Sequence, residues 1–197
     1  MFSPLIKELM ESLRCLPGVG PKSAQKMALY LLERDSQGAD RLACSLRDAL
    51  DKVGRCGTCR TLTEDSECSI CLDQERDQTR LCIVETPADV IAMENAGSFD
   101  GRYFVLLGHL SPIDGIGPEE LGLDRLEKLV VQASVEEVII ATNSTIEGEA
   151  TSHYISELLK PLNIELSRLA QGVPIGGELE YVDGNTLALA LKGRKKL

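Results

Sequence analysis

Apolar side chains in the first 53 residues recur at the three- and four-residue spacing of amphipathic helices. One such stripe predicts a helix over residues 4–15, with Pro4 in its first turn. A second predicts a helix from Lys22 to Glu33, and a third predicts a helix that ends before Gly54 and packs on the first two. Between the first two helices, two glycines and two prolines in the stretch 16–21 predict a tight hairpin.

Beyond residue 78 the hydrophobic period changes. Short runs that are apolar on both faces occur at residues 81–84, 103–107 and 138–141, with helical patterns between them at 88–95 and 123–133. Buried strands that alternate with helices are typical of a largely parallel sheet with crossover helices. A further strand is expected at 164–169. After a glycine-rich stretch we expect a last short helix, capped by Asn185.

Composition describes an ordinary soluble globular protein: 197 residues, 43% hydrophobic and 26% charged, with no apolar run near the ~20 residues of a membrane span. The net charge of −10 is unevenly distributed. Residues 1–55 carry a net charge of +2 and residues 56–197 a net charge of −12, with four basic residues gathered at 192–196. This asymmetry assigns any contact with DNA to the N-terminal part.

Two CxxC pairs lie eight residues apart. Their four thiols are those of Cys56, Cys59, Cys68 and Cys71. This spacing predicts a closed, structural Zn²⁺ site with one ion per chain, and leaves no open position for catalysis. Two disulfides are the alternative, but the N-terminus lacks a secretory pattern, and a reducing cytoplasm favours metal ligands. The other thiols, Cys15, Cys44 and Cys82, are interpreted as packed residues.

The stretch 16–26 resembles a helix-hairpin-helix module. In such a module, glycines such as Gly18 and Gly20 let backbone N–H groups approach a phosphate, and Lys22 and Lys26 lie one turn apart beside it. The resemblance implies DNA binding without sequence specificity. A glycine-containing turn in a helical bundle is the alternative.

A glutamate, Glu85, follows the first strand, and the sequence from 142 to 149 follows the third. Together they resemble the Toprim fold, in which a glutamate, a D-x-D and an E-G-E segment hold Mg²⁺. Asn143 and Thr145 stand in the two aspartate positions, whereas Glu147 and Glu149 remain. Losing two carboxylates weakens a magnesium cage, so we expect an acidic site or partner surface without strand cleavage. Helix N-terminal chemistry is the alternative for Glu147 and Glu149.

A further resemblance covers nearly the whole chain and includes these stretches. The pattern CxxCxxxTxxxxCxICxxxxR is matched in full, with Thr63, Ile70 and Arg76 beside the four cysteines, and is similar to the signature of the RecR family of bacterial recombination mediators. The resemblance extends from LPGVGPKSAQ to GVPIGGELEY. It implies a homo-oligomer, such as a ring-shaped tetramer, that acts with RecO and RecF to load RecA onto SSB-coated single-stranded DNA.

The fold class expected is α/β. Its predicted regions are a helix-hairpin-helix region (1–53), a four-cysteine zinc finger (54–77), a Toprim-like domain (78–171) and a C-terminal arm with a short helix (172–197). We expect a non-enzymatic protein of the bacterial cytoplasm and nucleoid that binds single- and double-stranded DNA and no membrane. A Mg²⁺-dependent Toprim nuclease, topoisomerase or primase is the alternative. The Gly/Pro-rich stretch 108–122 is a candidate contact loop.

Overall fold

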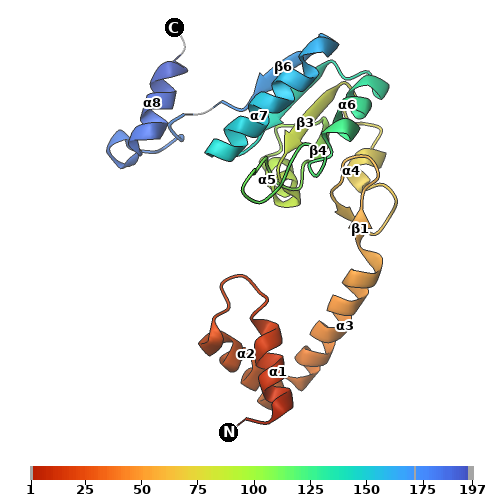
Figure 1. Ribbon diagram of the computed structural model, residues 1–197, viewed down its shortest axis with the longest axis vertical. Coiled ribbons are helices and arrows are strands. Elements are labelled where there is room, and N and C mark those ends of the chain that lie inside the picture. The colour runs from red at the N-terminus through yellow and green to blue at the C-terminus, as the bar shows by residue number, and fades with distance from the viewer. Residues whose placement is uncertain (1, 171, 195–197) are drawn as a thin grey trace. The chain divides into compact units, whose positions relative to one another are not determined.

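The computed structural model describes residues 2–170 and 172–194. The chain divides into two compact units, residues 1–53 (the N-terminal unit) and 54–197 (the C-terminal unit), each with its own elements (Figure 1). The ends of three predicted regions, at residue 1, at residue 171 and at residues 195–197, lie outside the described part.

The N-terminal unit consists of three helices: α1 (Pro4–Leu13), α2 (Pro21–Glu33) and α3 (Ser36–Lys52). Local sequence determines where each begins. Ser3 caps α1 through its side chain, and Asp35 caps α3 by accepting the Gly38 N–H at 2.7 Å. The three helices predicted from the hydrophobic period are confirmed.

The predicted packing of the third helix is wrong in part. Only Ala24 and Ala28, both on α2, are fully buried among the described residues of this unit, and α3 contacts α2 without burying any residue of its own. Leu42, Leu46 and Leu50 on α3 are 45%, 56% and 83% exposed. Three short helices have too little mutual surface to cover every apolar stripe, so much of this one faces outward.

The cysteine-containing segment opens the C-terminal unit. It contains a two-stranded antiparallel pair, β1 (Gly54–Arg55) and β2 (Leu62–Thr63), and one short helix, α4 (Ser69–Leu72). The hydrophobic pattern did not predict these elements because each is only two to four residues long.

Four parallel strands follow, in the order β4-β3-β5-β6, which confirms the predicted parallel sheet. They are β3 (Arg80–Val84), β4 (Arg102–Val105), β5 (Glu137–Ala141) and β6 (Glu165–Arg168). Val84 pairs with Ala141, so the two strands end side by side. Glu85 and the segment after Ala141 are therefore brought to the same edge of the sheet.

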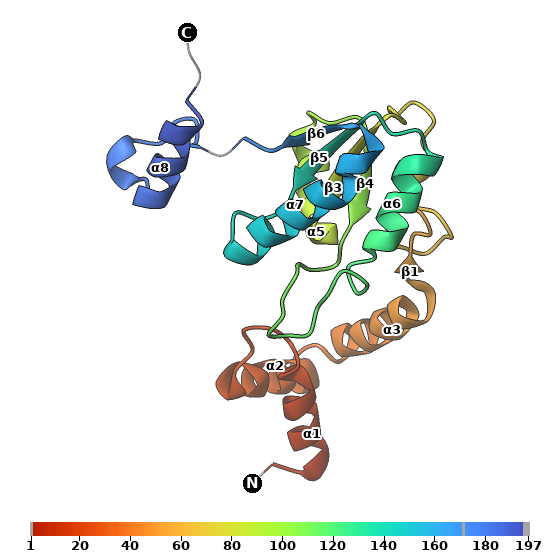
Figure 2. The ribbon, with the colours of Figure 1, turned by 45° about the horizontal axis from the view of Figure 1, so that its top comes forward.

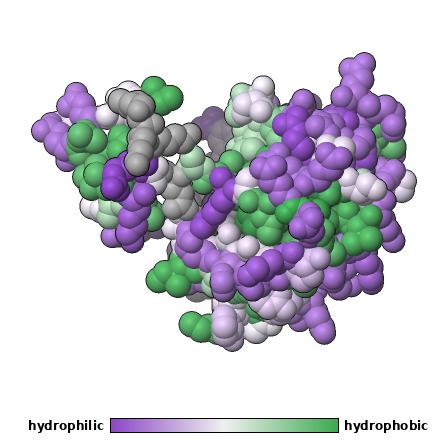
Figure 3. Space-filling model, turned by 90° about the horizontal axis from the view of Figure 1, so that it is seen from above, coloured by the Kyte–Doolittle hydropathy of each residue, from purple (hydrophilic) through white to green (hydrophobic). Residues whose placement is uncertain are grey.

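Helices cover both faces of this sheet. The helices α6 (Leu123–Gln132) and α7 (Ile146–Leu159) pack against Leu81 and Ile83 on one face, and α5 (Pro87–Ala96) packs against Cys82 and Val84 on the other (Figure 2). Alternate residues of β3 thus supply the two cores, and the interpretation of Cys82 as a core residue is confirmed. Side chains at the border of the larger core are only partly buried. Seen from above, the surface of the molecule has a hydrophobic patch bordered by hydrophilic side chains (Figure 3).

The chain continues through two single-turn helices, η1 (Lys160–Leu162) and η2 (Leu179–Tyr181), to a final helix, α8 (Gly184–Lys192). Asp183 caps α8, whereas Asn185 was predicted to do so. The Asp183 carboxylate accepts the N–H groups of Asn185 and Thr186, both at 3.0 Å, so the helix begins two residues earlier than a cap at Asn185 would allow. Within residues 2–170 and 172–194, no helix combines the length and hydrophobicity needed to cross a membrane.

Candidate functional site

The four cysteines of the two CxxC pairs converge. Their sulfur atoms all lie within 4.8 Å of one another, with Cys59 Sγ and Cys68 Sγ 3.5 Å apart. Four sulfurs around a zinc ion, each about 2.3 Å from it, are expected about 3.8 Å from one another. The cluster therefore fits a tetrahedral ion, and all four side chains are buried.

Backbone amides surround Cys56 Sγ. The N–H groups of Cys59 and Cys68 donate to this sulfur at 3.5 and 3.3 Å, so one residue from each CxxC pair holds it in position. The turn that makes this possible is held by the Gly57 N–H, which donates to the Ser66 carbonyl at 2.8 Å. Donors of this kind around a ligand atom are typical of metal sites.

The pKa values of the other three thiols are shifted in different directions. A hydrogen bond from Cys71 lowers the pKa of Cys59 to about 6, against the opposing effect of burial. Burial raises the pKa of Cys68 to about 11, and the contact with Cys59 raises the pKa of Cys71. One thiolate is thus stabilised at the expense of its neighbours, and a divalent cation would favour losing the other protons as well.

The cysteine-containing segment from β1 to α4, residues 54–72, is called the knuckle below. It is joined to the rest of the C-terminal unit by its backbone and by arginines. The Val105 N–H, at the end of β4, donates to the Cys59 carbonyl at 2.9 Å. Arg76, in the matched pattern, donates to the Gly101 carbonyl at 2.6 Å and forms an ion pair with Glu94. Sequence reasoning missed Arg60, which lies between the ligand pairs and is 8% exposed. Its pKa is lowered by burial and by the nearby charges of Arg125 and Arg55.

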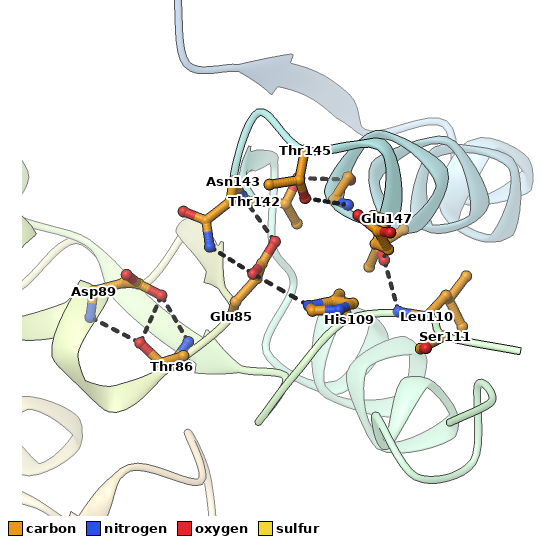
Figure 4. Close-up of polar contacts among 12 residues, drawn as sticks. Glu85, Thr86, Asp89, His109, Leu110, Ser111, Thr142, Asn143, Thr145 and Glu147 are labelled. Carbon is orange, nitrogen blue, oxygen red and sulfur yellow. Dashed lines mark hydrogen bonds and ion pairs between the residues drawn. The ribbon is translucent and has the colours of Figure 1, made fainter. Parts of the chain in front are cut away.

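At the edge of the sheet, Glu85 is buried and already paired. One carboxylate oxygen accepts the Asn143 backbone N–H at 2.8 Å and the other accepts the Asn143 side-chain amide at 2.6 Å (Figure 4). His109 Nδ1 lies 3.7 Å from the second oxygen, a proximity that sequence spacing did not indicate. Only 4% of Glu85 is exposed, so its carboxylate depends on partners within the chain for its hydrogen bonds.

The other acidic residues of this predicted site do not join Glu85. Thr145 caps α7 by accepting the Gly148 N–H at 3.0 Å, so Glu147 and Glu149 lie in the first turn of that helix. Arg168 holds Glu149 through two contacts of 2.6 Å. Among the described residues, the only group of three or more close potential metal ligands is the cysteine cluster.

A small residue is required next to this pair. Gly148 lies so close to the Asn143 carbonyl that an added Cβ would overlap it, and the same Cβ would lie 3.0 Å from Glu85 Oε1. The glycine of the E-G-E segment therefore permits the close approach of the α7 N-terminus to Glu85.

Two of the predicted DNA-binding residues, Gly18 and Gly20, lie in the hairpin between α1 and α2, and the two lysines lie on α2. Gly18 has a φ of +77°, a conformation that other residues adopt at a cost, and Gly20 is the N-cap of α2. Because Gly20 has no side chain and Pro21 no N–H, no side chain caps the first turn of α2. Lys22 and Lys26 are exposed on that helix.

The candidate contact loop is ordered by its own bonds. Ser111 and Ile116 exchange backbone hydrogen bonds of 3.0 and 2.9 Å, and Ile113 at the tip is 97% exposed. The interpretation of Cys15 and Cys44 as packed residues is wrong, because both are exposed on the sparsely packed N-terminal helices.

The fold and the cysteine cluster define a class of protein with a helix-hairpin-helix unit, a four-cysteine cluster that could hold a metal ion, and a Toprim-type α/β domain. Family models match three stretches: "RecR, helix-hairpin-helix" over residues 6–50, "Toprim domain" over 79–170 and "RecR, C-terminal" over 172–195. The recombination protein RecR of Saccharophagus degradans is 62% identical over 197 residues, all of both chains. The chain belongs to the RecR family of recombination proteins.

Replacing one cysteine of the cluster should remove the metal. We expect Cys56→Ser or Cys71→Ser to lower zinc content from about one per chain to near zero, and to lower the melting temperature, because binding of structural zinc contributes roughly 10 kcal/mol or more to small domains. Elemental analysis and thermal melting measure both. Cys44→Ser, at an exposed thiol, is the control and should keep its zinc. Fresh, reduced wild type without zinc would contradict the assignment.

Restoring the two aspartates should create a divalent-metal site at a cost in stability. Asn143→Asp with Thr145→Asp replaces the amide donor to buried Glu85 with a like charge, and we expect a loss of about 2–3 kcal/mol. Aspartate still caps α7, so the loss comes from position 143. Repulsion between Glu85 and the new carboxylate at position 143 raises a carboxyl pKa of this pair in the folded double variant. The double variant therefore loses stability as pH rises through that raised pKa, and regains it below about pH 4.

Thermal melting with and without millimolar Mg²⁺ tests this expectation. The double variant should gain more stability from Mg²⁺ than wild type does, through linkage between binding and folding. Asn95→Asp, which adds a carboxylate to an exposed position of α5, is the control and should gain nothing further. Equal gains in wild type and double variant would show that these carboxylates do not converge on an ion.

Proposed function

We propose that this chain is a non-enzymatic, DNA-binding mediator of recombinational repair, which acts with RecO and RecF to promote loading of RecA onto SSB-coated single-stranded DNA. Membership of the RecR family supports the recombination role. The observation that carries the non-enzymatic part is the pairing of Glu85 with Asn143, which uses both carboxylate oxygens of the residue expected to hold Mg²⁺ in a catalytic Toprim site.

Catalysis of phosphoryl transfer requires clustered anionic oxygens around a hard cation. In this chain Glu85 is engaged by Asn143, Glu149 by Arg168, and the hydroxyl of Thr145 by the start of α7. Glu147 is the remaining exposed carboxylate of the predicted set. The alternative, a Mg²⁺-dependent nuclease, topoisomerase or primase, would have to break these contacts to assemble its metal site.

The N-terminal unit supplies the DNA contact in this proposal. The uncapped first turn of α2 offers backbone N–H groups and the positive end of a helix dipole to a phosphate. The ion pairs in the described part of this unit are Arg14–Glu11 and Lys52–Asp48, so Lys22 and Lys26 keep their charge available. Contacts of this kind do not discriminate between bases, which suits single- and double-stranded DNA of any sequence.

In the same proposal the cysteine cluster holds one structural Zn²⁺ per chain, and the chain has four functional regions: 1–53 for DNA, 54–77 for the metal, 78–171 as a Toprim-like partner-binding domain and 172–197 as a C-terminal arm. The acidic C-terminal unit suits partner proteins better than DNA. Acting on chromosomal DNA would place the protein in the bacterial cytoplasm and nucleoid.

A homo-oligomer, such as a ring-shaped tetramer, is also part of the proposal. Its support is an apolar groove of about 470 Å³ within the N-terminal unit. Leucines from all three helices and from the hairpin line it: Leu9, Leu13, Leu16, Leu31, Leu32, Leu42 and Leu46. An uncovered groove of this kind is typical of a protein interface. Light scattering that returned the monomer mass at micromolar concentration would contradict this part.

Two assays with the purified full-length protein test the function. Labelled single- and double-stranded DNA incubated with Mg²⁺ or Mn²⁺ should remain intact. The same protein, added with RecO and RecF, should speed DNA-dependent ATP hydrolysis by RecA on SSB-coated strands. Cleavage that disappears in Glu85→Gln would overturn the non-enzymatic proposal. No acceleration with both partners present would overturn the mediator role.

Removing the two lysines should weaken DNA binding equally for all sequences. We expect Lys22→Ala with Lys26→Ala to raise the dissociation constant and to flatten the slope of log K against log[salt] by about 0.7–0.9 for each phosphate that is no longer neutralised. Fluorescence anisotropy at several salt concentrations measures the slope. Lys128→Ala with Lys160→Ala removes the same charge from the C-terminal unit and is the control. An unchanged slope in the first variant would place the DNA contact elsewhere.

A further inference from the structure

Arg60 is an unusual residue to find between two pairs of metal ligands. Its guanidinium is buried over the Phe104 ring, 5.5 Å from the ring centre, and none of the ion pairs among the described residues involves it. It donates instead to two backbone carbonyls, those of Leu121 and, at 3.3 Å, Glu120. A buried cation without a carboxylate partner is costly, so its surroundings must hold it in place.

The knuckle provides that constraint. Arg60 adopts a φ of +68°, the left-handed conformation that a side chain with a Cβ rarely takes. Its own N–H donates to the Cys56 carbonyl at 3.1 Å, and the Cys56 N–H donates to the Thr61 carbonyl at 2.8 Å. The strained conformation is therefore part of the turn that directs the Cys56 and Cys59 sulfurs inward.

The segment that the Arg60 guanidinium contacts is also shaped to receive it. Gly122, the N-cap of α6, has a φ of +70°, and a Cβ added there would lie 2.5 Å from Arg60 Nη1. The segment before it is a compact turn, in which Gly122 donates to the Glu119 carbonyl at 2.9 Å and Leu123 to the Pro118 carbonyl at 3.1 Å. Arg60 thus occupies space left by a glycine and fixes the point at which α6 begins.

This segment shapes an acidic surface. Together with α6 and α7 it borders a hollow of about 480 Å³. Four carboxylates and four apolar or aromatic side chains line the hollow: Glu119, Glu120, Asp124, Glu127, Pro118, Leu123, Tyr154 and Leu158. Any change in the position of residues 117–124 would alter the spacing of these charges.

We propose that Arg60 is a positioning residue that couples metal occupancy of the cysteine cluster to the conformation of residues 117–124. With the metal bound, the knuckle holds Arg60 against the Glu120 and Leu121 carbonyls, and the acidic hollow keeps its shape. Without the metal, only local hydrogen bonds maintain the left-handed turn, Arg60 withdraws, and the start of α6 loosens. The inference rests on the proposed zinc site.

Hydrogen exchange of the full-length protein, followed by mass spectrometry, tests the coupling. In zinc-loaded wild type, chelation should speed exchange of the 117–124 amides roughly tenfold or more, the size expected for losing hydrogen bonds to a charged donor. Amides of β5 should not change. In zinc-loaded Arg60→Met, which keeps the apolar stem and the backbone strain, the same amides should already exchange at the chelated rate. Arg55→Met removes a neighbouring charge and should behave as wild type.

Zinc affinity gives a second readout, because coupling is reciprocal. If zinc protects the segment through Arg60, Arg60→Met should bind zinc more weakly by a comparable factor in competition with a chromophoric chelator, and Arg60→Lys should lie between. The coupling would be overturned if chelation left the exchange of the 117–124 amides unchanged in zinc-loaded wild type, or if these amides exchanged at the wild-type rate in zinc-loaded Arg60→Met. Neither result would contradict the zinc site. Wild type that holds no zinc would overturn the metal assignment first.

Discussion

Convergence of four sulfur atoms in a segment without a core of its own is the constraint on which this molecule depends. The cysteines are the buried residues of that segment's cluster, with Ile70 packed against them. Their mutual contacts lower the pKa of Cys59 and raise the pKa of Cys71, and a divalent cation would favour the thiolate form of all four. The knuckle is joined to β4 through the Cys59 carbonyl, and to the start of α6 through hydrogen bonds of Arg60 and Arg125.

At the carboxyl edge of the parallel sheet, the carboxylate that a Toprim-type metal site would use is paired within the chain. A carboxylate at the end of the first strand of a Toprim-type domain is placed to bind a cation, but here an asparagine amide and its backbone N–H reach Glu85 first. Gly148 permits this approach, and the Thr145 hydroxyl is engaged by the α7 N-terminus. Carboxylates that are held by internal donors contribute to local order at this edge of the sheet.

The two units differ in charge and in packing. The N-terminal unit combines a small positive charge with an uncapped helix start, features that attract phosphate, and it leaves an apolar groove uncovered. The C-terminal unit is strongly acidic and buries two continuous cores on either side of its sheet. These properties support the proposed division of labour, in which the first unit contacts nucleic acid and a second copy of the chain, and the second unit contacts partner proteins.

Hydrophobic period and cysteine spacing are local signals, and they were enough to predict the helices of the N-terminal unit, the parallel sheet, the glycine hairpin and the candidate metal ligands. The remaining features depend on contacts between segments that are distant in the sequence. The pairing of β3 with β5 brings Asn143 to both carboxylate oxygens of Glu85, which the sequence did not indicate. The packing of the helices likewise shows that the apolar side chains along α3 are exposed. The bonds of Arg60 join residues about sixty positions apart, and no periodicity records such a contact. Local patterns specify elements, whereas burial and pairing between distant segments specify what each side chain does.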